Sequence, residues 1–153
     1  MHTLLSQLRR HRWAQRLRYE AIYSWPGWRD CSAFNVGCWP LDADVANDPA
    51  SAAEPNQIQL YAELIRTAAL TPAGLKDTAV LEIAAGRGGG LAYIKKTFAP
   101  AALTGLDISR SAVRHGRARG LDMIAGSAHR LPFPDRQFDL VLSLDALVHL
   151  ADR

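Results

Sequence analysis

The fold is decided by residues 78–90, which read TAVLEIAAGRGGG. The first seven of these form an apolar run broken only by Glu82, and this run predicts a buried strand. The glycines that follow predict a turn, and residues 91–98 predict a short helix that ends near Pro100. Glycine lets a ligand approach the backbone, and a helix N-terminus presents unpaired N–H groups. We therefore expect the turn to hold a nucleotide-like ligand, while a glycine turn required by geometry alone is the alternative.

The same pattern of strand, turn and helix continues toward the end of the chain. Further strands are predicted at LTGLDI (103–108), at DMIAGSA (122–128) and within PDRQFDLVLSL (134–144), where a turn comes first. Residues 109–120 predict a helix with Ser109 as its candidate N-cap. Strands that alternate with helices favour right-handed crossovers. The sequence therefore predicts an α/β fold, a Rossmann-like, doubly wound and mostly parallel sheet preceded by N-terminal helices.

The N-terminal segment differs in charge from the rest of the chain. Residues 1–30 contain six arginines against Glu20 and Asp30, a local +4, whereas the remainder holds 12 basic and 13 acidic residues. Residues 4–23 predict a helix that can place several apolar side chains near one face, namely Leu5, Leu8, Trp13, Leu17 and Ile22. We expect this helix to pack on the domain with its arginines in solvent. Contact with an anionic membrane surface or an acidic ligand is the second interpretation, and a mitochondrial transit peptide is the third.

Turn-forming residues separate this basic helix from the predicted sheet. Residues 24–56 contain prolines at 26, 40, 49 and 55, so little regular structure is expected there, and residues 57–70 predict a helix. We divide the chain into an N-terminal basic helix with an irregular aromatic connector, residues 1–56, and a ligand-binding domain, residues 57–153.

Composition limits the classes of protein to which the chain can belong. With 153 residues and 48% apolar content it can bury the core of one domain. It has no apolar run near the roughly 20 residues that span a bilayer, so a cytoplasmic protein is expected. Cys31 and Cys38 fit neither a redox pair nor a zinc site, so we expect reduced thiols and no metal. No nucleic-acid partner is expected.

Asp107 lies where the acidic partner of a ribose is expected in a nucleotide-binding α/β domain. It stands 21 positions after Gly86, at the end of the second predicted strand. One carboxylate can accept hydrogen bonds from two neighbouring hydroxyls, although Asp107 could instead cap the following helix. An NAD(P)-binding oxidoreductase shares these features, but the third glycine of its fingerprint would fall on Leu91, and the fingerprint leaves Glu82 unexplained.

In these residues and in the segments that follow them, the sequence resembles the class I S-adenosylmethionine-dependent methyltransferases. The family's first motif, acidic-x-Gly-x-Gly-x-Gly, corresponds to Glu82, Ala84, Gly86 and Gly88, with alanine at the first glycine. LTGLDIS resembles its second motif, and GSAHRLPFPDRQFDLVLSLDALVHL resembles its third and fourth. The resemblance covers residues 78–152 and implies S-adenosyl-L-methionine as cofactor.

The resemblance also implies roles for individual residues at the cofactor. Backbone at the three turn positions would line its methionine and ribose parts, Glu82 would organise the turn or reach its amino group, and Asp107 would hold the ribose hydroxyls. Ile108 would flank the adenine, two residues would meet the adenine edge, and one would approach from the fourth strand. The full predicted set is Glu82, Ala84, Gly86, Gly88, Asp107, Ile108, Ser127, Ala128 and Leu144. Ala84 fits the turn if its φ is negative, and Ser127 replaces the family's usual acid. Both departures are expected to reduce cofactor affinity.

The acceptor is less well indicated than the cofactor. Residues 35–39, NVGCW, look like an Asn-x-Gly-Tyr-Trp element of methyltransferases that act on polyketide lipids, sterols or tocopherols, with Cys38 in place of tyrosine. This favours a small-molecule, lipid-like acceptor. No catalytic residue is identified, and His149 is expected to be a packed helix residue rather than a general base. Because none of the predicted contacts lies in residues 1–20, deleting them is expected to leave cofactor binding intact.

The number of strands leads to a further expectation. Methyltransferases of this family resemble one another in having seven strands, whereas four are predicted before Arg153. We expect the chain to supply the cofactor-binding half of the enzyme and to be inactive alone, as a truncated product, a fragment or half of a split enzyme. A non-catalytic module is an alternative. The fourth strand would then be an apolar edge that self-associates or binds a partner chain.

Overall fold

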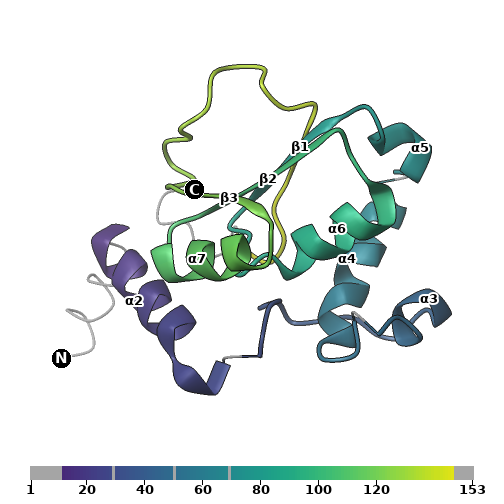
Figure 1. The fold of residues 1–153 in the computed structure, drawn as a ribbon, viewed down its shortest axis with the longest axis horizontal. Helices are drawn as coiled ribbons and strands as arrows, with labels where there is room; N and C mark the ends of the chain where they lie inside the picture. Colours follow the sequence, from purple (N-terminus) through teal and green to yellow (C-terminus); the bar gives the residue numbers. More distant parts are fainter. Residues whose placement is uncertain (1–11, 29, 50, 69, 147–153) are drawn as a thin grey trace.

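The structure, a computed structural model, describes residues 12–28, 30–49, 51–68 and 70–146. Figure 1 shows the chain with the helices and strands labelled. The elements in chain order are α2 (Arg12–Ser24), η1 (Pro26–Trp28), α3 (Ala43–Ala46), α4 (Pro55–Thr67), α5 (Pro72–Leu75), β1 (Ala79–Ile83), α6 (Gly89–Phe98), β2 (Ala102–Asp107), α7 (Arg110–Ala118), β3 (Asp122–Ala125) and β4 (Leu140–Leu142).

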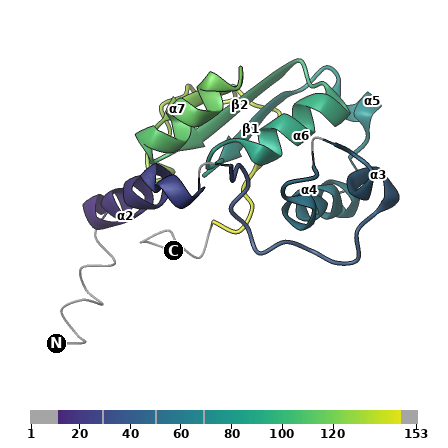
Figure 2. The same ribbon diagram turned by 60° about the horizontal axis from the view of Figure 1, so that its bottom comes forward.

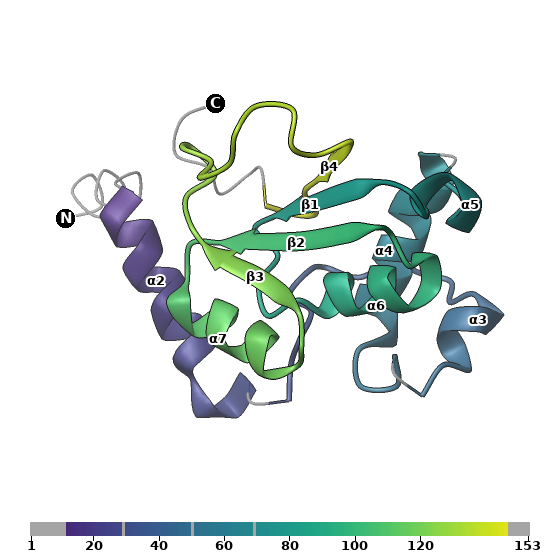
Figure 3. The same ribbon diagram turned by 45° about the horizontal axis from the view of Figure 1, so that its top comes forward.

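The strands form one parallel sheet in the order β3-β2-β1-β4. Figure 3 shows the sheet with α6 and α7, the helices that connect β1 to β2 and β2 to β3. The order reverses direction after β3, because the chain returns to the far side of β1 to form β4. Open α/β sheets bind ligands beyond the carboxyl ends of their strands at such a switch point. The predicted doubly wound α/β fold is confirmed.

Two apolar clusters hold the helices to the sheet. One joins α4, α5 and α6 to β1 and comprises Tyr61, Ile65, Leu75, Val80, Ile94 and Phe98. The other lies beneath α7 and comprises Ala85, Leu91, Val113, Leu121 and Met123. A third, smaller cluster of Ala33, Val45 and Ile58 packs the connector on α4. The connector is therefore anchored, although it has little regular structure.

Two element boundaries differ from the predicted ones, at the start of α4 and at the end of β3. The helix predicted over 57–70 begins at Pro55, because proline at the first helical position already has a helical φ. The third strand ends at Ala125, although the Gly126 amide still donates to the Asp107 carbonyl at 2.9 Å. The chain then bends through a bridge between Ser127 and Arg130.

Helix α2 lies against α7, as Figure 2 shows from a second side. The Glu20 carboxylate accepts hydrogen bonds from the Ser109 hydroxyl at 2.8 Å and from the Ser111 amide at 3.0 Å. The prediction that Trp13, Leu17 and Ile22 lie near one face of this helix is wrong. Trp13 and Leu17 are 57% and 62% exposed, whereas Ile22 faces inward, because at 100° per residue it lies opposite Trp13. Leu5 and Leu8 lie outside the described residues.

None of the helices in the described part of the chain combines the length and the apolarity that crossing a bilayer requires. Cys31 and Cys38 are free thiols.

Candidate functional site

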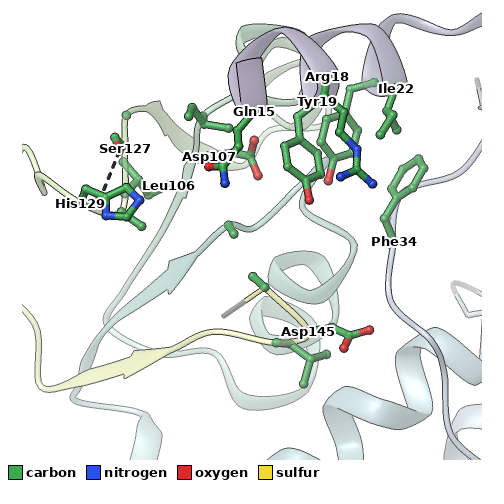
Figure 4. A pocket seen from close by; sticks show the side chains of 17 residues that line it. Gln15, Arg18, Tyr19, Ile22, Phe34, Leu106, Asp107, Ser127, His129 and Asp145 are labelled. Atoms are coloured by element: carbon green, nitrogen blue, oxygen red, sulfur yellow. Dashed lines mark hydrogen bonds between the residues drawn. The ribbon is translucent and has the colours of Figure 1, made fainter. Parts of the chain in front are cut away.

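A cavity of about 260 Å³ lies at the carboxyl ends of the strands (Figure 4). Its walls come from the residues that follow each strand: Ala84 after β1, Ile108 after β2, residues 126–129 after β3 and residues 144–146 after β4. This is the edge at which the switch in strand order predicts a ligand site. The remaining wall is supplied by α2 and Phe34.

Six of the nine residues predicted to bind the cofactor line this cavity, namely Ala84, Asp107, Ile108, Ser127, Ala128 and Leu144. The structure thus brings together residues from the ends of all four strands. Glu82, Gly86 and Gly88 do not line the cavity and lie behind it in β1 and in the turn. The role of each residue at the cofactor stays a prediction.

The turn after β1 is built on left-handed backbone conformations. Gly86 and Gly88 have φ values of 56° and 80°, which glycine adopts without penalty. Ala84 has φ of 59°, so it occupies the turn without the negative φ that is the expected condition for an alanine there. A left-handed conformation costs a residue with a Cβ roughly 1–2 kcal/mol. The first turn position therefore keeps the glycine-like geometry of the motif with an alanine in it.

The small residues of the turn also admit two tyrosine side chains. A Cβ on Gly86 would lie 2.9 Å from the Tyr23 hydroxyl, and one on Gly90 would overlap the Tyr61 ring. Tyr23 comes from α2 and Tyr61 from α4. These contacts give a structural reason for glycine at both positions, and the binding of a ligand by the turn stays a prediction.

Asp107 is fixed at the end of β2 by two backbone amides. One carboxylate oxygen accepts from Gly86 N and the other from Ser109 N, both at 2.8 Å. The capping role belongs to Ser109, whose hydroxyl accepts from Ala112 N, as predicted. Burial raises the pKa of Asp107 to about 6, against the effect of these amide hydrogen bonds. A carboxylate has about four acceptor sites, so acceptor capacity remains for a ribose hydroxyl.

Glu82 lies inside the sheet, away from the cavity. Its side chain is 1% exposed, and one of its oxygens accepts a hydrogen bond from the Tyr61 hydroxyl at 2.6 Å. Its other oxygen, Oε2, has no hydrogen-bond partner among the described residues. Burial, together with the negative charge of Asp107, raises the pKa of Glu82 to about 8, against the effect of the Tyr61 hydrogen bond. Glu82 is therefore placed to support the turn from behind.

Helix α2 supplies site residues that the sequence did not reveal. Gln15, Tyr19 and Ile22 line the cavity together with Tyr23 and Arg18. Gln15, Arg18 and Tyr19 fall within residues 1–20, so the premise that this segment contributes nothing near the site is wrong, while the effect of deleting it on cofactor binding stays a prediction. The spacing of Tyr19, Ile22 and Tyr23 places them on one face of the helix and could have predicted that this face is buried. Trp13 and Leu17 form a second apolar face on the opposite side, so the sequence does not decide between the two.

Arg87 fastens the end of this helix to the glycine turn. Its buried guanidinium donates to the backbone carbonyls of Tyr23, Trp28 and Cys31. The chain after α2 is therefore held by the turn itself, and the tyrosines of α2 are held over the cavity.

The wall after β3 is held by a local contact, and the wall after β4 by a contact with the connector. The Ser127 hydroxyl, predicted at the adenine edge, accepts from His129 N at 3.3 Å. Asp145 accepts from Val36 N at 3.0 Å, which brings the NVGCW element beside the cavity. Asn35 steadies that element by accepting from Gly37 N at 2.9 Å and donating to the Gln57 carbonyl. His149 lies outside the described residues.

Comparison with known proteins identifies the family. The family described as "Methyltransferase domain" matches residues 80–153. The chain is 40% identical over 116 residues to the phthiotriol/phenolphthiotriol dimycocerosates methyltransferase of Mycobacterium tuberculosis, covering 71% of the chain and 41% of that protein. It is 35% identical over 97 residues to the fatty-acid O-methyltransferase of Mycolicibacterium smegmatis, covering 61% of the chain and 35% of that protein.

Two solved structures share the fold. The magnesium protoporphyrin IX methyltransferase of Synechocystis, crystallised with SAM, has a TM-score of 0.58 at 15% identity, covering 88% of this chain and 64% of that one. The geranyl diphosphate C-methyltransferase of Streptomyces coelicolor has a TM-score of 0.57 at 15% identity, covering 84% and 54%. The chain spans about 35–58% of the length of the curated relatives it matches. Its motifs, its fold and these matches together support a class I S-adenosylmethionine-dependent methyltransferase, with the matched methyltransferase domain at residues 80–153.

Proposed function

We propose that this chain binds S-adenosyl-L-methionine in the cavity and supplies the cofactor-binding half of a methyl transfer to a lipid-like small molecule. The observation that carries the proposal is the position of Asp107. Its carboxylate lies at the cavity wall, is oriented by two amides and keeps acceptor sites for a ribose diol.

The residues around the cavity fit an adenosine-containing cofactor. In the proposed site Asp107 holds the ribose hydroxyls, Ile108 flanks the adenine, and Ser127 and Ala128 meet its edge. Leu144 approaches the cofactor from the fourth strand, and the backbone of Ala84 lines its methionine and ribose parts, while Gly86 and Gly88 shape the turn behind the cavity. Glu82 contributes by supporting the turn rather than by contact, because Tyr61 and the sheet enclose it.

When bound, the cofactor supplies an electrophilic methyl group on a sulfonium. The contribution of this chain is to orient that group and to exclude water from it. Tyr19, Ile22 and Phe34 form a largely apolar wall opposite the strand ends, which suits both tasks. No side chain is assigned as a general base.

A lipid-like acceptor is supported by the same apolar wall and by the names of two relatives. One is named for a dimycocerosate and the other for a fatty acid. The NVGCW element, which contacts Asp145 at the cavity, is consistent with this class of acceptor.

Methyl transfer from labelled S-adenosylmethionine tests the proposal. The purified chain is incubated with the labelled cofactor and, separately, with a long-chain fatty acid, a long-chain diol or glycine. Because the chain is proposed to supply only the cofactor-binding half, cofactor binding without transfer is the expected result for the chain alone. If label is transferred, it should enter the organic phase with either lipid and not reach glycine. Label transferred to glycine alone would contradict the lipid-like acceptor. Cofactor binding without transfer to any acceptor would favour a non-catalytic or split-enzyme role.

A further inference from the structure

We propose that the outward face of α2 docks this chain on an anionic lipid surface. The helix has two apolar faces, of which one forms a wall of the cavity and the other is largely exposed. Tyr19, Ile22 and Tyr23 point to the cavity, while Trp13 and Leu17 lie on the other side.

The outward face is apolar along its length. Trp13, Leu17 and Ala21 are spaced four residues apart and form a single stripe, and all three are exposed. Exposing a tryptophan and a leucine at 57% and 62% on one helix is unfavourable in water. A surface that takes up these side chains therefore gains the free energy of burying them.

Positive charge flanks this stripe. At 100° per residue, Arg16 falls on one side of the stripe and Arg18 on the other, and both are exposed. Residues 1–30 carry a net +4 by sequence. Apolar residues between flanking arginines are typical of helices that lie in the plane of a membrane, where arginines contact acidic headgroups.

Exposed apolar side chains are also concentrated in this part of the molecule. Among the described residues, eight large hydrophobic residues are clearly exposed, and six of them lie between residues 13 and 39. Four of the six are tryptophans, and Trp25 and Trp28 directly follow α2 at 64% and 46% exposure. Tryptophan is the residue that membrane–water interfaces favour most, together with tyrosine.

Docking through the outward face of α2 would also fix the position of the cavity relative to the lipid surface. Because the opposite side of the same helix forms a cavity wall (Figure 4), docking would hold the cavity about one helix diameter, roughly 10 Å, from the lipid surface. A lipid-like acceptor that leaves the surface would then be released close to the cavity. This step rests on the proposed function, whereas docking itself does not.

Vesicle binding by the full 153-residue chain tests the proposal. Sedimentation and tryptophan fluorescence are measured with vesicles of phosphatidylcholine alone and of phosphatidylcholine mixed with phosphatidylglycerol. We expect binding to the mixed vesicles, with a blue shift of the fluorescence, and little binding to phosphatidylcholine. Raising the salt from about 0.1 M to about 1 M shortens the Debye length from about 10 Å to about 3 Å and should weaken binding.

Two matched pairs of variants locate the surface. Leu17→Ser should weaken vesicle binding by about tenfold, whereas Leu131→Ser, at an exposed leucine outside α2, should leave it unchanged. Arg16→Gln should weaken it by about fivefold, whereas Arg130→Gln should not. Each variant must retain the thermal transition of the parent chain.

Three outcomes would overturn the proposal. The first is equal binding to neutral and anionic vesicles, and the second is an equal effect of Leu17→Ser and Leu131→Ser on binding. The third is a dimer that forms without vesicles and dissociates in Leu17→Ser, which would show that a second copy of the chain covers this face. S-adenosylhomocysteine binding, measured on the same protein without vesicles, reports on the cofactor site separately.

Discussion

Two buried carboxylates lie on adjacent strands, Glu82 on β1 and Asp107 on β2, and burial raises the pKa of both. The values differ, about 8 for Glu82 and about 6 for Asp107. At neutral pH Glu82 is therefore mainly protonated and Asp107 mainly ionised. The difference follows from their partners, because Asp107 receives two backbone amides and Glu82 a single tyrosine hydroxyl.

The pKa of Asp107 predicts how cofactor binding depends on pH. If the ionised carboxylate holds the ribose, affinity is lost as pH falls through about 6. S-Adenosylhomocysteine should bind about tenfold more weakly at about pH 5 than at about pH 7, because the ionised fraction falls by that factor. Calorimetry at the two pH values measures the change. In Asp107→Asn the affinity should be lower and nearly independent of pH. If this variant keeps the pH dependence of the parent chain, that dependence belongs to another group.

Glu82 predicts a pH dependence of stability. Its pKa is raised from 4.5 to about 8 on folding, so the folded chain binds more protons between these values and its stability falls as pH rises through them. Glu82→Gln cannot ionise and keeps an acceptor for Tyr61. Its thermal midpoint should therefore change less with pH over this window. Asp77→Asn, at an exposed carboxylate, is the matched control and should follow the parent curve. Parallel curves for Glu82→Gln and the parent would contradict the assignment.

At the scale of elements, α2 is the one whose role changes most between sequence and structure. It is tied to the N-terminus of α7 by Glu20 and to the glycine turn through Arg87. Although partial burial raises the pKa of Glu20, the Ser109 hydroxyl and the amides of Ser111 and Arg110 lower it overall. An anion at this position is also favoured by the dipole of α7.

Removing this tie should loosen the cavity wall. Glu20→Ala removes a side-chain acceptor from a helix N-terminus, a change that costs about 1 kcal/mol, and should lower the thermal midpoint by about 2–4 °C. It should also weaken S-adenosylhomocysteine binding, because Tyr19 and Tyr23 lose their anchor. Glu63→Ala, which removes a surface ion pair with Arg66, is the control and should leave binding unchanged. Unchanged cofactor affinity in a destabilised Glu20→Ala would show that α2 does not contribute to the site.

The order of elements could be predicted from the sequence, but the orientation of α2 could not. Ser109 marks a helix start and Asp107 a strand end because both depend on local chemistry. The face of α2 depends on which of two apolar stripes finds a partner. The contact of Tyr23 with Gly86 joins residues 63 positions apart, for which a single sequence has no local signal.

At the scale of the whole molecule, β4 is an edge of the described sheet. Its central residue, Val141, is 52% exposed, and the strand has only three residues. The strand is thus shorter than the FDLVLSL segment from which an edge was predicted. Pairing of this edge with a second chain stays a prediction, as do the division at residue 56 and the inactivity of the chain alone.

A charge on the edge tests that prediction. Val141→Lys should reduce self-association, because lysine on an edge strand opposes pairing with another strand. Light scattering over a range of concentrations measures the effect. Leu131→Lys adds the same charge at an exposed apolar residue outside the strands and should have less effect. A parent chain that stays monomeric at all concentrations would remove the edge as an association site.

The central claim, that the cavity at the strand ends is an S-adenosylmethionine site organised by Asp107, is tested most directly by calorimetry with S-adenosylhomocysteine and with NADH. The parent chain should bind S-adenosylhomocysteine and not NADH. Asp107→Ala should weaken that binding by about 1.5–3 kcal/mol, the range for hydrogen bonds to a charged group. Asp77→Ala should bind as the parent does. Binding of NADH alone, or equal affinities for the parent and a folded Asp107→Ala, would contradict the account.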